Sequence, residues 1–220
     1  MTAPTIPARV AEPRWEPIVA ILVVLGLVLA LPGRYQLAPP WFPVVIASII
    51  IGAMLAVTFL PASIFWHRVE RLVVLAFFVL ALCMNSLTIG RLAADMITHQ
   101  HDYSGITLLE SAAVIWTVNV LLFALLYWQV DRAGPEARAA GDEGTADFDF
   151  AELREAERAH AWRPHFIDYL FIAFATSTSF TPPDYAKPGT RRAKGVVMVQ
   201  ASISLVTLFL IASRAIATLS

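Results

Sequence analysis

Residues 166–184, FIDYLFIAFATSTSFTPPD, decide how the rest of the chain is interpreted. The apolar part of this stretch, Phe166 to Phe180, is 15 residues long, whereas a helix that crosses a bilayer upright needs about 20. Pro182 and Pro183 then end any helix, because proline lacks a backbone donor and clashes with the preceding turn. Backbone groups freed at such a break must face protein or water and cannot face lipid. The stretch therefore predicts a re-entrant half-helix followed by an irregular turn.

Oxygen-bearing side chains crowd the same break, and an acid follows the two prolines. A turn rich in hydroxyl and carbonyl oxygens can replace the hydration shell of an ion. We therefore expect a filter or constriction made by Thr176, Ser177, Thr178, Ser179, Phe180, Thr181, Pro182, Pro183 and Asp184.

The apolar segment behind the turn, Val196 to Leu219, is long enough to span a membrane. Gln200, Ser204 and Thr207 follow one another at steps of four and three, so a helix places them on one stripe. The stripe has two explanations. Its polar groups could line a pore, or they could make helix–helix contacts, because Ser and Thr are common at helix interfaces in membranes.

Composition supports a membrane protein. The 220 residues are 58% hydrophobic and 15% charged, against about 45–50% and 25% in ordinary soluble domains. A soluble enzyme is therefore excluded. The net charge of −1 gives no basic field for nucleic acid, and the single Cys83 excludes an internal disulfide and a cysteine-rich metal site.

Four further apolar segments are expected to span the bilayer: Pro17 to Leu31, Trp41 to Leu60, Leu72 to about Ile97, and Ile106 to Val130. Together with the final segment they predict an all-α integral membrane protein of about five spanning helices plus the re-entrant segment. The chain then divides into a four-helix membrane region (1–130), a polar insertion (131–163), and the half-helix with the last helix (164–220).

The polar insertion has two parts. Residues 133–147 are rich in Ala, Gly and acids, which predicts a flexible linker. Residues 148–162 are weakly amphipathic and predict a juxtamembrane helix lying on the bilayer or on a neighbouring element. Asp168, near the start of the half-helix, is expected to cap that helix.

Charge placement predicts the orientation. If the half-helix returns to the side it came from, only Arg34, Arg91 and Arg214 lie opposite the N-terminus, and the other thirteen basic residues share its side. The positive-inside rule makes that side cytoplasmic. We therefore expect a cytoplasmic N-terminus and insertion, and an external C-terminus.

Several polar residues lie within the other spanning segments. Asn85 and Asn119 are expected to hydrogen-bond one another, since polar groups at membrane depth usually find partners. Arg91 is four residues from Asp95 and can pair with it on one helix face, with Glu110 as the alternative partner.

Catalysis and metal binding have little support in the sequence. His99, His101 and Asp102 form a weak candidate for a metal site in an exposed loop, and we expect no metal and no cofactor. No catalytic triad order, zinc-protease motif or nucleotide-binding loop is present. The chain is therefore expected not to be an enzyme.

Two resemblances follow from these residues. The block from Asp168 to Arg214 resembles the pore loop and inner helix of the tetrameric potassium-channel superfamily. The whole chain is similar to an uncharacterised family of bacterial multi-pass membrane proteins. The similar pieces are IWTVN at 115–119, YWQVDRAGP at 127–135, WRPHFIDYLFIAFATSTSFTPPD at 162–184 and RRAK at 191–194.

The resemblance implies a channel-like homo-oligomer, with a tetramer favoured, in the bacterial plasma membrane. It would conduct monovalent cations past a Thr/Ser-rich filter that lacks both glycines of the potassium filter. The alternative is a non-conducting scaffold or partner-binding protein that keeps the pore-loop fold. The rigid Pro182–Pro183 pair and the missing glycines favour this alternative.

Overall fold

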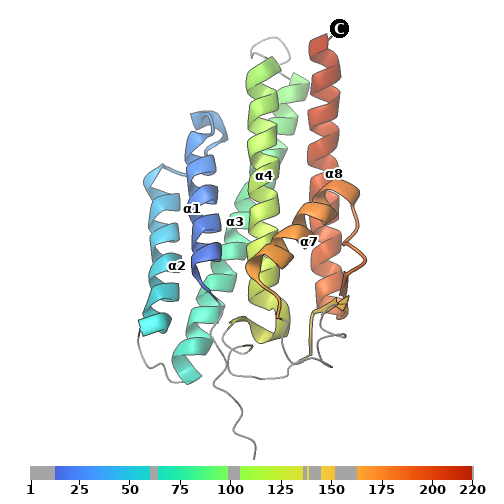
Figure 1. Ribbon diagram of the computed structural model, residues 1–220. Helices are drawn as coiled ribbons and strands as arrows, with labels where there is room; N and C mark the ends of the chain where they lie inside the picture. The colour runs from blue at the N-terminus through green and yellow to red at the C-terminus, as the bar shows by residue number, and fades with distance from the viewer. Residues whose placement is uncertain are drawn as a thin grey trace, which may run out of the picture.

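The computed structural model describes residues 13–59, 64–98, 105–135, 138, 145–151 and 163–219. The structure is mostly helical (81%). Figure 1 shows the long helices standing side by side, with one short helix, α7, laid obliquely against two of them.

Within the described residues three helices are long and apolar enough to cross a membrane: α3 (Ile64–Thr98), α4 (Gly105–Val130) and α8 (Arg191–Leu219). Helix α4 lies at the centre, since 61% of its apolar span is buried, against 28% for α3 and 22% for α8. Such helices suit a bilayer because every backbone group within them is paired. The chain is therefore compatible with a membrane protein, and α4 is the helix around which the others pack.

Two shorter apolar helices, α1 (Trp15–Ala30) and α2 (Trp41–Phe59), stand beside this group. Their 16 and 19 residues correspond to about 24 and 28 Å of helix. A short 3-10 turn, η1 (Gly33–Tyr35), lies between them. At the other end, Arg14 at the start of α1 donates to the backbone oxygen of Met54 on α2 at 2.6 Å.

Helix α7 (Phe166–Ser179) is flanked by two short strands that pair with each other. Strands β1 (Phe148–Phe150) and β2 (Ala186–Pro188) run antiparallel, with Phe150 opposite Ala186. The chain therefore leaves one end of the molecule in α7, returns to that same end, and starts α8 there, as Figure 1 shows.

Strand β1 corrects the amphipathic helix expected over 148–162, because residues 148–150 are extended. Phe148 and Phe150 are each only 1% exposed. The alternation Phe-Asp-Phe has the two-residue period of a strand, and burial of both rings decides the conformation. Residues 152–162 of the expected helix lie outside the described residues.

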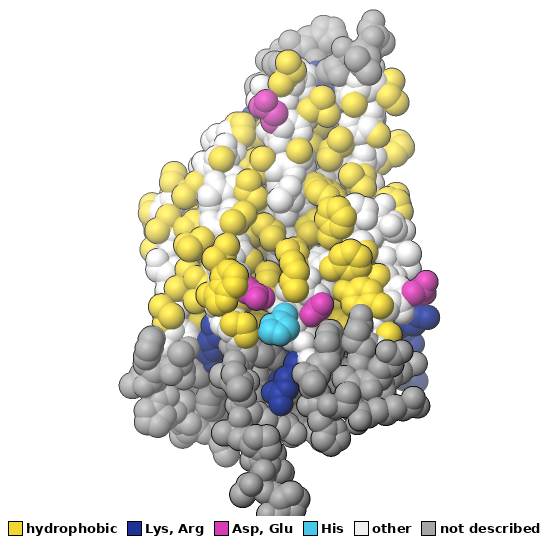
Figure 2. Space-filling view, in the orientation of Figure 1, with side chains coloured by type: hydrophobic (Ala, Val, Ile, Leu, Met, Phe, Trp, Pro, Cys, Tyr) yellow, Lys and Arg dark blue, Asp and Glu magenta, His cyan; other side chains and the backbone are white. Residues whose placement is uncertain are grey.

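The outer surface is largely apolar. Figure 2 shows hydrophobic side chains spread over this face, with Lys, Arg and His side chains near its lower edge. The outward face of α8 contributes Met198, Leu205, Phe209 and Ile216, all more than half exposed. Apolar surface of this extent is suited to contact with lipid or with other protein helices.

Candidate functional site

A buried polar cluster lies where α4, α7 and α8 meet. All but one of its members were predicted from the sequence, as part of the filter, of the polar stripe on the last helix, or as polar residues within a spanning segment. The exception is Tyr127. They are Asn119, Tyr127, Thr176, Ser177, Gln200, Ser204 and Thr207, each at most 1% exposed. Buried polar groups of this kind are costly unless hydrogen-bonded, so their bonds define what the cluster does.

Gln200 joins all three helices. Its Nε2 donates to the backbone oxygen of Ala173 at 2.8 Å and to the Ser177 hydroxyl at 2.9 Å, both on α7. Its Oε1 accepts a hydrogen bond from the Tyr127 hydroxyl on α4. One amide of α8 therefore holds α7 against α4.

Ser204 and Asn119 extend the cluster one turn along α8. The Ser204 hydroxyl lies 3.0 Å from the Ser177 hydroxyl, and Asn119 Nδ2 donates to Ser204 at 3.2 Å. Thr207 donates to the backbone oxygen of Ile203 within α8. Within one chain the polar stripe of α8 thus makes helix contacts, the second of its two explanations.

Two atoms of the cluster have no hydrogen-bond partner among the described residues: Thr176 Oγ1 and Asn119 Oδ1. Both side chains are 0% exposed. An unpaired buried oxygen costs about 1–3 kcal/mol. The cluster therefore retains two oxygens that a water molecule or a cation would stabilise.

The last two residues of α7 and the turn that follows them are exposed. Thr178, Ser179, Phe180 and Thr181 all face outward, and the Asp184 side chain is fully exposed. The expected filter is thus split, with Thr176 and Ser177 buried and the later residues at the surface.

Phe180 ends α7 in the left-handed region, with φ 58°. This conformation is uncommon for a non-glycine residue and rare for a bulky one. Such strain persists only where the surroundings enforce it. The turn therefore makes its sharp bend without the glycines of a potassium filter.

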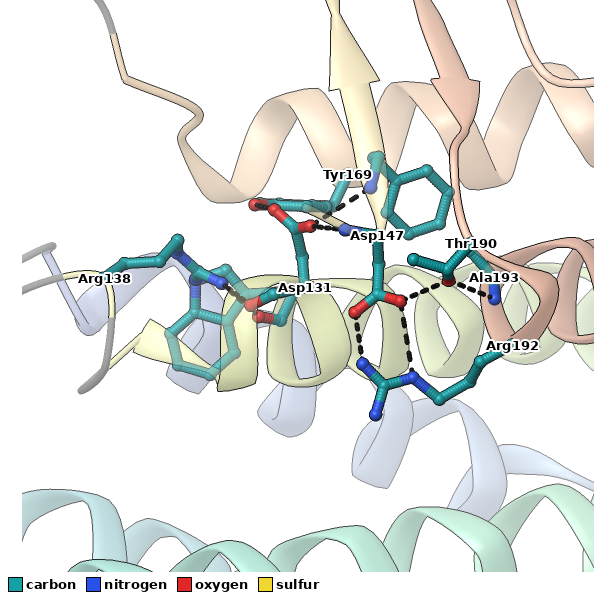
Figure 3. Close-up of polar contacts among 9 residues, drawn as sticks. Asp131, Arg138, Asp147, Tyr169, Thr190, Arg192 and Ala193 are labelled. Carbon is teal, nitrogen blue, oxygen red and sulfur yellow. Dashed lines mark hydrogen bonds and ion pairs between the residues drawn. The ribbon is translucent and has the colours of Figure 1, made fainter. Parts of the chain in front are cut away.

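Asp131, at the end of α4, is a buried carboxylate that organises the chain before α7 (Figure 3). Its Oδ1 accepts from the backbone N–H groups of Asp147 at 2.8 Å and Phe148 at 3.1 Å, and its Oδ2 accepts from the Tyr169 hydroxyl at 2.7 Å. A negative charge at the C-terminus of a helix is disfavoured by the helix dipole. Three donors offset that cost and tie α4 to β1 and α7.

The chain reverses directly after Asp131 through a 3-10 turn, η2 (Asp131–Ala133). Arg132, Ala133 and Gly134 all have positive φ. At Gly134 the φ of 101° strains any other residue, and an added Cβ would lie 3.2 Å from the backbone oxygen of Gln129.

Arg138 caps the C-terminal end of α4. Its Nη1 donates to the backbone oxygens of Trp128 at 3.0 Å and Asp131 at 2.7 Å, two carbonyls near the end of α4. The last carbonyls of a helix have no partner within the helix, so these bonds cap it. The guanidinium also lies 5.5 Å from the centre of the Tyr169 ring, where a cation is attracted to the aromatic face.

Asp147 is a second buried carboxylate, and it fastens the start of α8 (Figure 3). Its Oδ2 lies 2.5 Å from Arg192 Nη2, and its Oδ1 accepts from the Thr190 hydroxyl at 2.5 Å. The Thr190 oxygen in turn accepts from the backbone N–H of Ala193 at 3.1 Å, as an N-terminal cap of α8. The segment before α7 is therefore bound to the first turn of the helix after it.

The two phenylalanines of β1 pack against tyrosines of α4 and α7. The Phe148 ring lies 4.9 Å from Tyr127, and the Phe150 ring lies 5.6 Å from Tyr169, both edge to face. Such pairs are worth about 0.5–1.5 kcal/mol beyond the area they bury. Strand β1 therefore inserts its two phenylalanines between α4 and α7.

Asp168 caps α7 as expected. Its Oδ2 accepts from the backbone N–H of His165 at 2.7 Å, which is half of a reciprocal capping box. This prediction is confirmed.

The expected bond between Asn85 and Asn119 is wrong. Asn119 instead bonds to Ser204, and Asn85 Nδ2 has no partner among the described residues. The two asparagines diverge because α4 turns its Asn119 face toward α8, whereas the Asn85 face of α3 looks toward α1 and α2.

The expected ion pair of Arg91 with Asp95 is also replaced. Asp95 Oδ1 lies 2.6 Å from Arg34 Nη2, because the turn between α1 and α2 reaches over the end of α3. Glu110, the alternative partner of Arg91, is exposed, and no ion pair joins these two described residues. The sequence could not show which loop would meet Asp95.

Four residues that hold the site were missed by sequence reasoning: Asp131, Asp147, Tyr169 and Arg192. One signal was available. Asp131 directly follows a spanning helix and stands at its negatively polarised end, a position that requires donors from elsewhere. Asp147 offered no comparable signal, because its partners lie 43 and 45 residues away.

Among the described residues no group of three or more His, Cys, Asp or Glu side chains could hold a metal ion. His99, His101 and Asp102 lie outside those residues. No protein-family model, curated protein or solved structure matches the chain. The chemistry of the site therefore has to be argued from its own geometry.

Proposed function

We propose that the protein is a channel-like membrane protein in which the exposed end of α7 and the turn after it, from Thr178 to Asp184, form the constriction. One observation carries the proposal: this turn presents hydroxyl, carbonyl and carboxylate oxygens at the surface, while the segments on both sides of it are held by buried polar contacts. Fixed oxygens at a set separation are what an ion needs when it sheds its hydration shell.

Three contacts hold the turn in position. The Tyr169 hydroxyl binds Asp131 at the start of α7. Ser177 binds Gln200 near the end of α7. Arg192 binds Asp147 after the chain has returned. A turn that is already held in place loses little conformational entropy when an ion binds to it.

A single chain supplies one wall, so the proposal requires a closed homo-oligomer, with a tetramer favoured. Copies of the turn would then meet around the axis and bind monovalent cations, with Asp184 attracting them to the mouth. In this arrangement the outward face of α8 bounds the rest of the path, because Gln200, Ser204 and Thr207 are occupied within the chain.

Cation flux into proteoliposomes tests the proposal. Wild-type protein should pass a monovalent cation. Thr178→Val should reduce the flux, since a methyl replaces a hydroxyl of the turn, and Asp184→Asn should reduce it mainly at low salt, where charge is least screened. Ser48→Ala, an exposed hydroxyl on α2, is the matched control and should leave the flux unchanged. No flux from the wild type, or equal flux in all variants, would overturn the proposal.

We further propose that α1, α2, α3, α4 and α8 span the bacterial plasma membrane and that α7 is re-entrant from the cytoplasmic side. Single cysteines at Gly141 and Gly189 in a Cys83→Ser background should both resist an impermeant thiol reagent in intact cells. Labelling of Gly189→Cys alone would mean that α7 crosses the membrane. Labelling of both would reverse the orientation.

A second candidate function is a non-conducting scaffold or partner-binding protein that keeps the pore-loop fold. The complete burial of the α8 polar stripe favours it, because those groups hold α7 and leave no polar lining on α8. Native mass spectrometry in nanodiscs separates the two functions. A strictly monomeric chain selects the scaffold, and a closed ring with flux selects the channel.

A further inference from the structure

An apolar cavity of about 140 Å³ lies among α1, α2, α3 and α4, away from the turn after α7. Its walls include Leu25, Ile46, Phe77 and Leu122, one from each helix. An enclosed apolar cavity of about 150 Å³ is large enough to take up a benzene-sized molecule. The space is therefore sufficient for a length of hydrocarbon chain.

Asn85 of α3 lines this cavity and is only 8% exposed. Its Nδ2 is buried and has no acceptor among the described residues. Three other polar side chains line the cavity. Thr88 donates to the backbone oxygen of Met84 at 3.0 Å, Gln36 donates to that of Leu31 at 2.8 Å, and the Tyr35 hydroxyl lies beside the Asp95 carboxylate. The cavity thus offers an unused donor to an apolar guest that carries an acceptor.

A shallow hollow lined by Pro32, Arg34, Arg91, Ala94 and Asp95 lies further along α3. Arg34 is paired with Asp95 at 2.6 Å. Arg91 is exposed and makes no hydrogen bond or ion pair with another described residue. The three charges leave the hollow with one excess positive charge.

The hollow and the cavity follow one another along α3. Asn85 and Thr88 line the cavity, and Arg91 lines the hollow one turn beyond Thr88 on α3. The six positions from Asn85 to Arg91 correspond to about 9 Å along the axis. From the hollow toward the cavity, the Arg91 guanidinium comes first, the Asn85 amide second and the apolar walls last.

We propose that the cavity and the hollow together bind one anionic phospholipid of the bilayer. The phosphate contacts Arg91, with Arg34 beside it, an ester carbonyl accepts from Asn85 Nδ2, and one acyl chain lies along the cavity toward Leu122. A phospholipid places an anionic oxygen, an ester carbonyl and a hydrocarbon chain in this same order. A choline headgroup would bring a positive charge to Arg91, so an anionic headgroup is preferred.

Native mass spectrometry of the intact protein, titrated with phosphatidylglycerol and phosphatidylcholine of identical acyl chains, tests the proposal. Phosphatidylglycerol should bind about tenfold more tightly, the factor expected for one ionic contact. Arg91→Gln should abolish this preference. Asn85→Leu should weaken both lipids, because both carry the ester carbonyl. Ala81→Phe, which places a ring in the cavity wall, should weaken both as well.

Two controls match these changes. Arg191→Gln removes an exposed arginine at the opposite end of the molecule, and Ser86→Ala removes an exposed hydroxyl next to Asn85. Neither should alter lipid binding. Equal binding of the two lipids by wild-type protein would overturn the proposal, as would an equal loss of preference in Arg191→Gln. Diacylglycerol and glycerol phosphate, tested alone, should each bind more weakly than the whole lipid. If either bound as tightly, the joint site would be wrong.

Discussion

Asp147 and Arg192 meet across 45 residues of chain, with Arg192 Nη2 2.5 Å from Asp147 Oδ2. The carboxylate is completely buried, whereas the guanidinium side chain is 58% exposed. Water can therefore solvate the cation but cannot reach the anion. We call this contact the clasp. Its loss would leave the buried Asp147 carboxylate without solvation, whereas Arg192 would remain hydrated.

Replacing Asp147 by Ala should lower the free energy of unfolding by about 2–4 kcal/mol, because Arg192 and Thr190 both lose their acceptor. Replacing Arg192 by Gln should cost less, about 1–2 kcal/mol, since Thr190 still binds the carboxylate. Unfolding in mixed detergent micelles measures both values. Lys187→Gln, which removes the surface ion pair with Asp184 at 3.5 Å, is the control and should leave the free energy of unfolding unchanged.

Gln200→Leu should cost about 2–4 kcal/mol, because the change removes three hydrogen bonds and leaves the buried Tyr127 hydroxyl without an acceptor. Tyr127→Phe should lower the free energy of unfolding by less, since it removes only the one hydrogen bond that the Gln200 Oε1 accepts. In the double variant the two losses should not add, because both remove the same bond. Additive losses would mean that the two side chains do not interact in the membrane.

Phe180→Asn should leave a more stable protein than Phe180→Val by about 1 kcal/mol. Both changes remove the ring, but asparagine tolerates the φ of 58° at this position and a β-branched residue does not. Thermal unfolding of the two variants side by side measures the difference. A more stable valine variant would show that the turn after α7 does not keep its left-handed residue.

Tyr35 supplies a pH-dependent prediction. Burial of its hydroxyl and the neighbouring Asp95 carboxylate raise the pKa of Tyr35 to about 12, against about 10 in an unfolded chain. Stability from the neutral phenol is therefore fully present below about pH 10 and is lost as the pH rises toward 12. The difference in absorbance at 295 nm between wild type and Tyr35→Phe should show a midpoint near pH 12. A midpoint near 10 would contradict the burial.

The fold was predictable where hydrophobicity alone sets it. The long apolar segments became α3, α4 and α8, and the short one before the two prolines became α7. The strand at 148–150 could not be predicted, because three residues are too few to distinguish the period of a strand from that of a helix. Its conformation depends on β2, which lies 38 residues further along the chain.

The site was predictable in composition but not in pairing. Gln200, Ser204 and Ser177 could be identified as polar residues of apolar segments, and Asp168 as a cap. Their partners required knowledge of which helix faces meet. Asp95 illustrates the difference, since it pairs with Arg34, 61 residues earlier, and not with the arginine on its own helix.

The clasp between Asp147 and Arg192 also sets an order of assembly during biosynthesis. When Asp147 is added to the growing chain, its partner is still 45 residues from being translated, a delay of roughly 2–9 s at 5–20 residues per second. Through that interval α7 is made but its return strand, its Gln200 contact and its ion pair do not yet exist. Helix α7 is therefore synthesised before the contacts that hold it, and the first turn of α8 supplies the last of them.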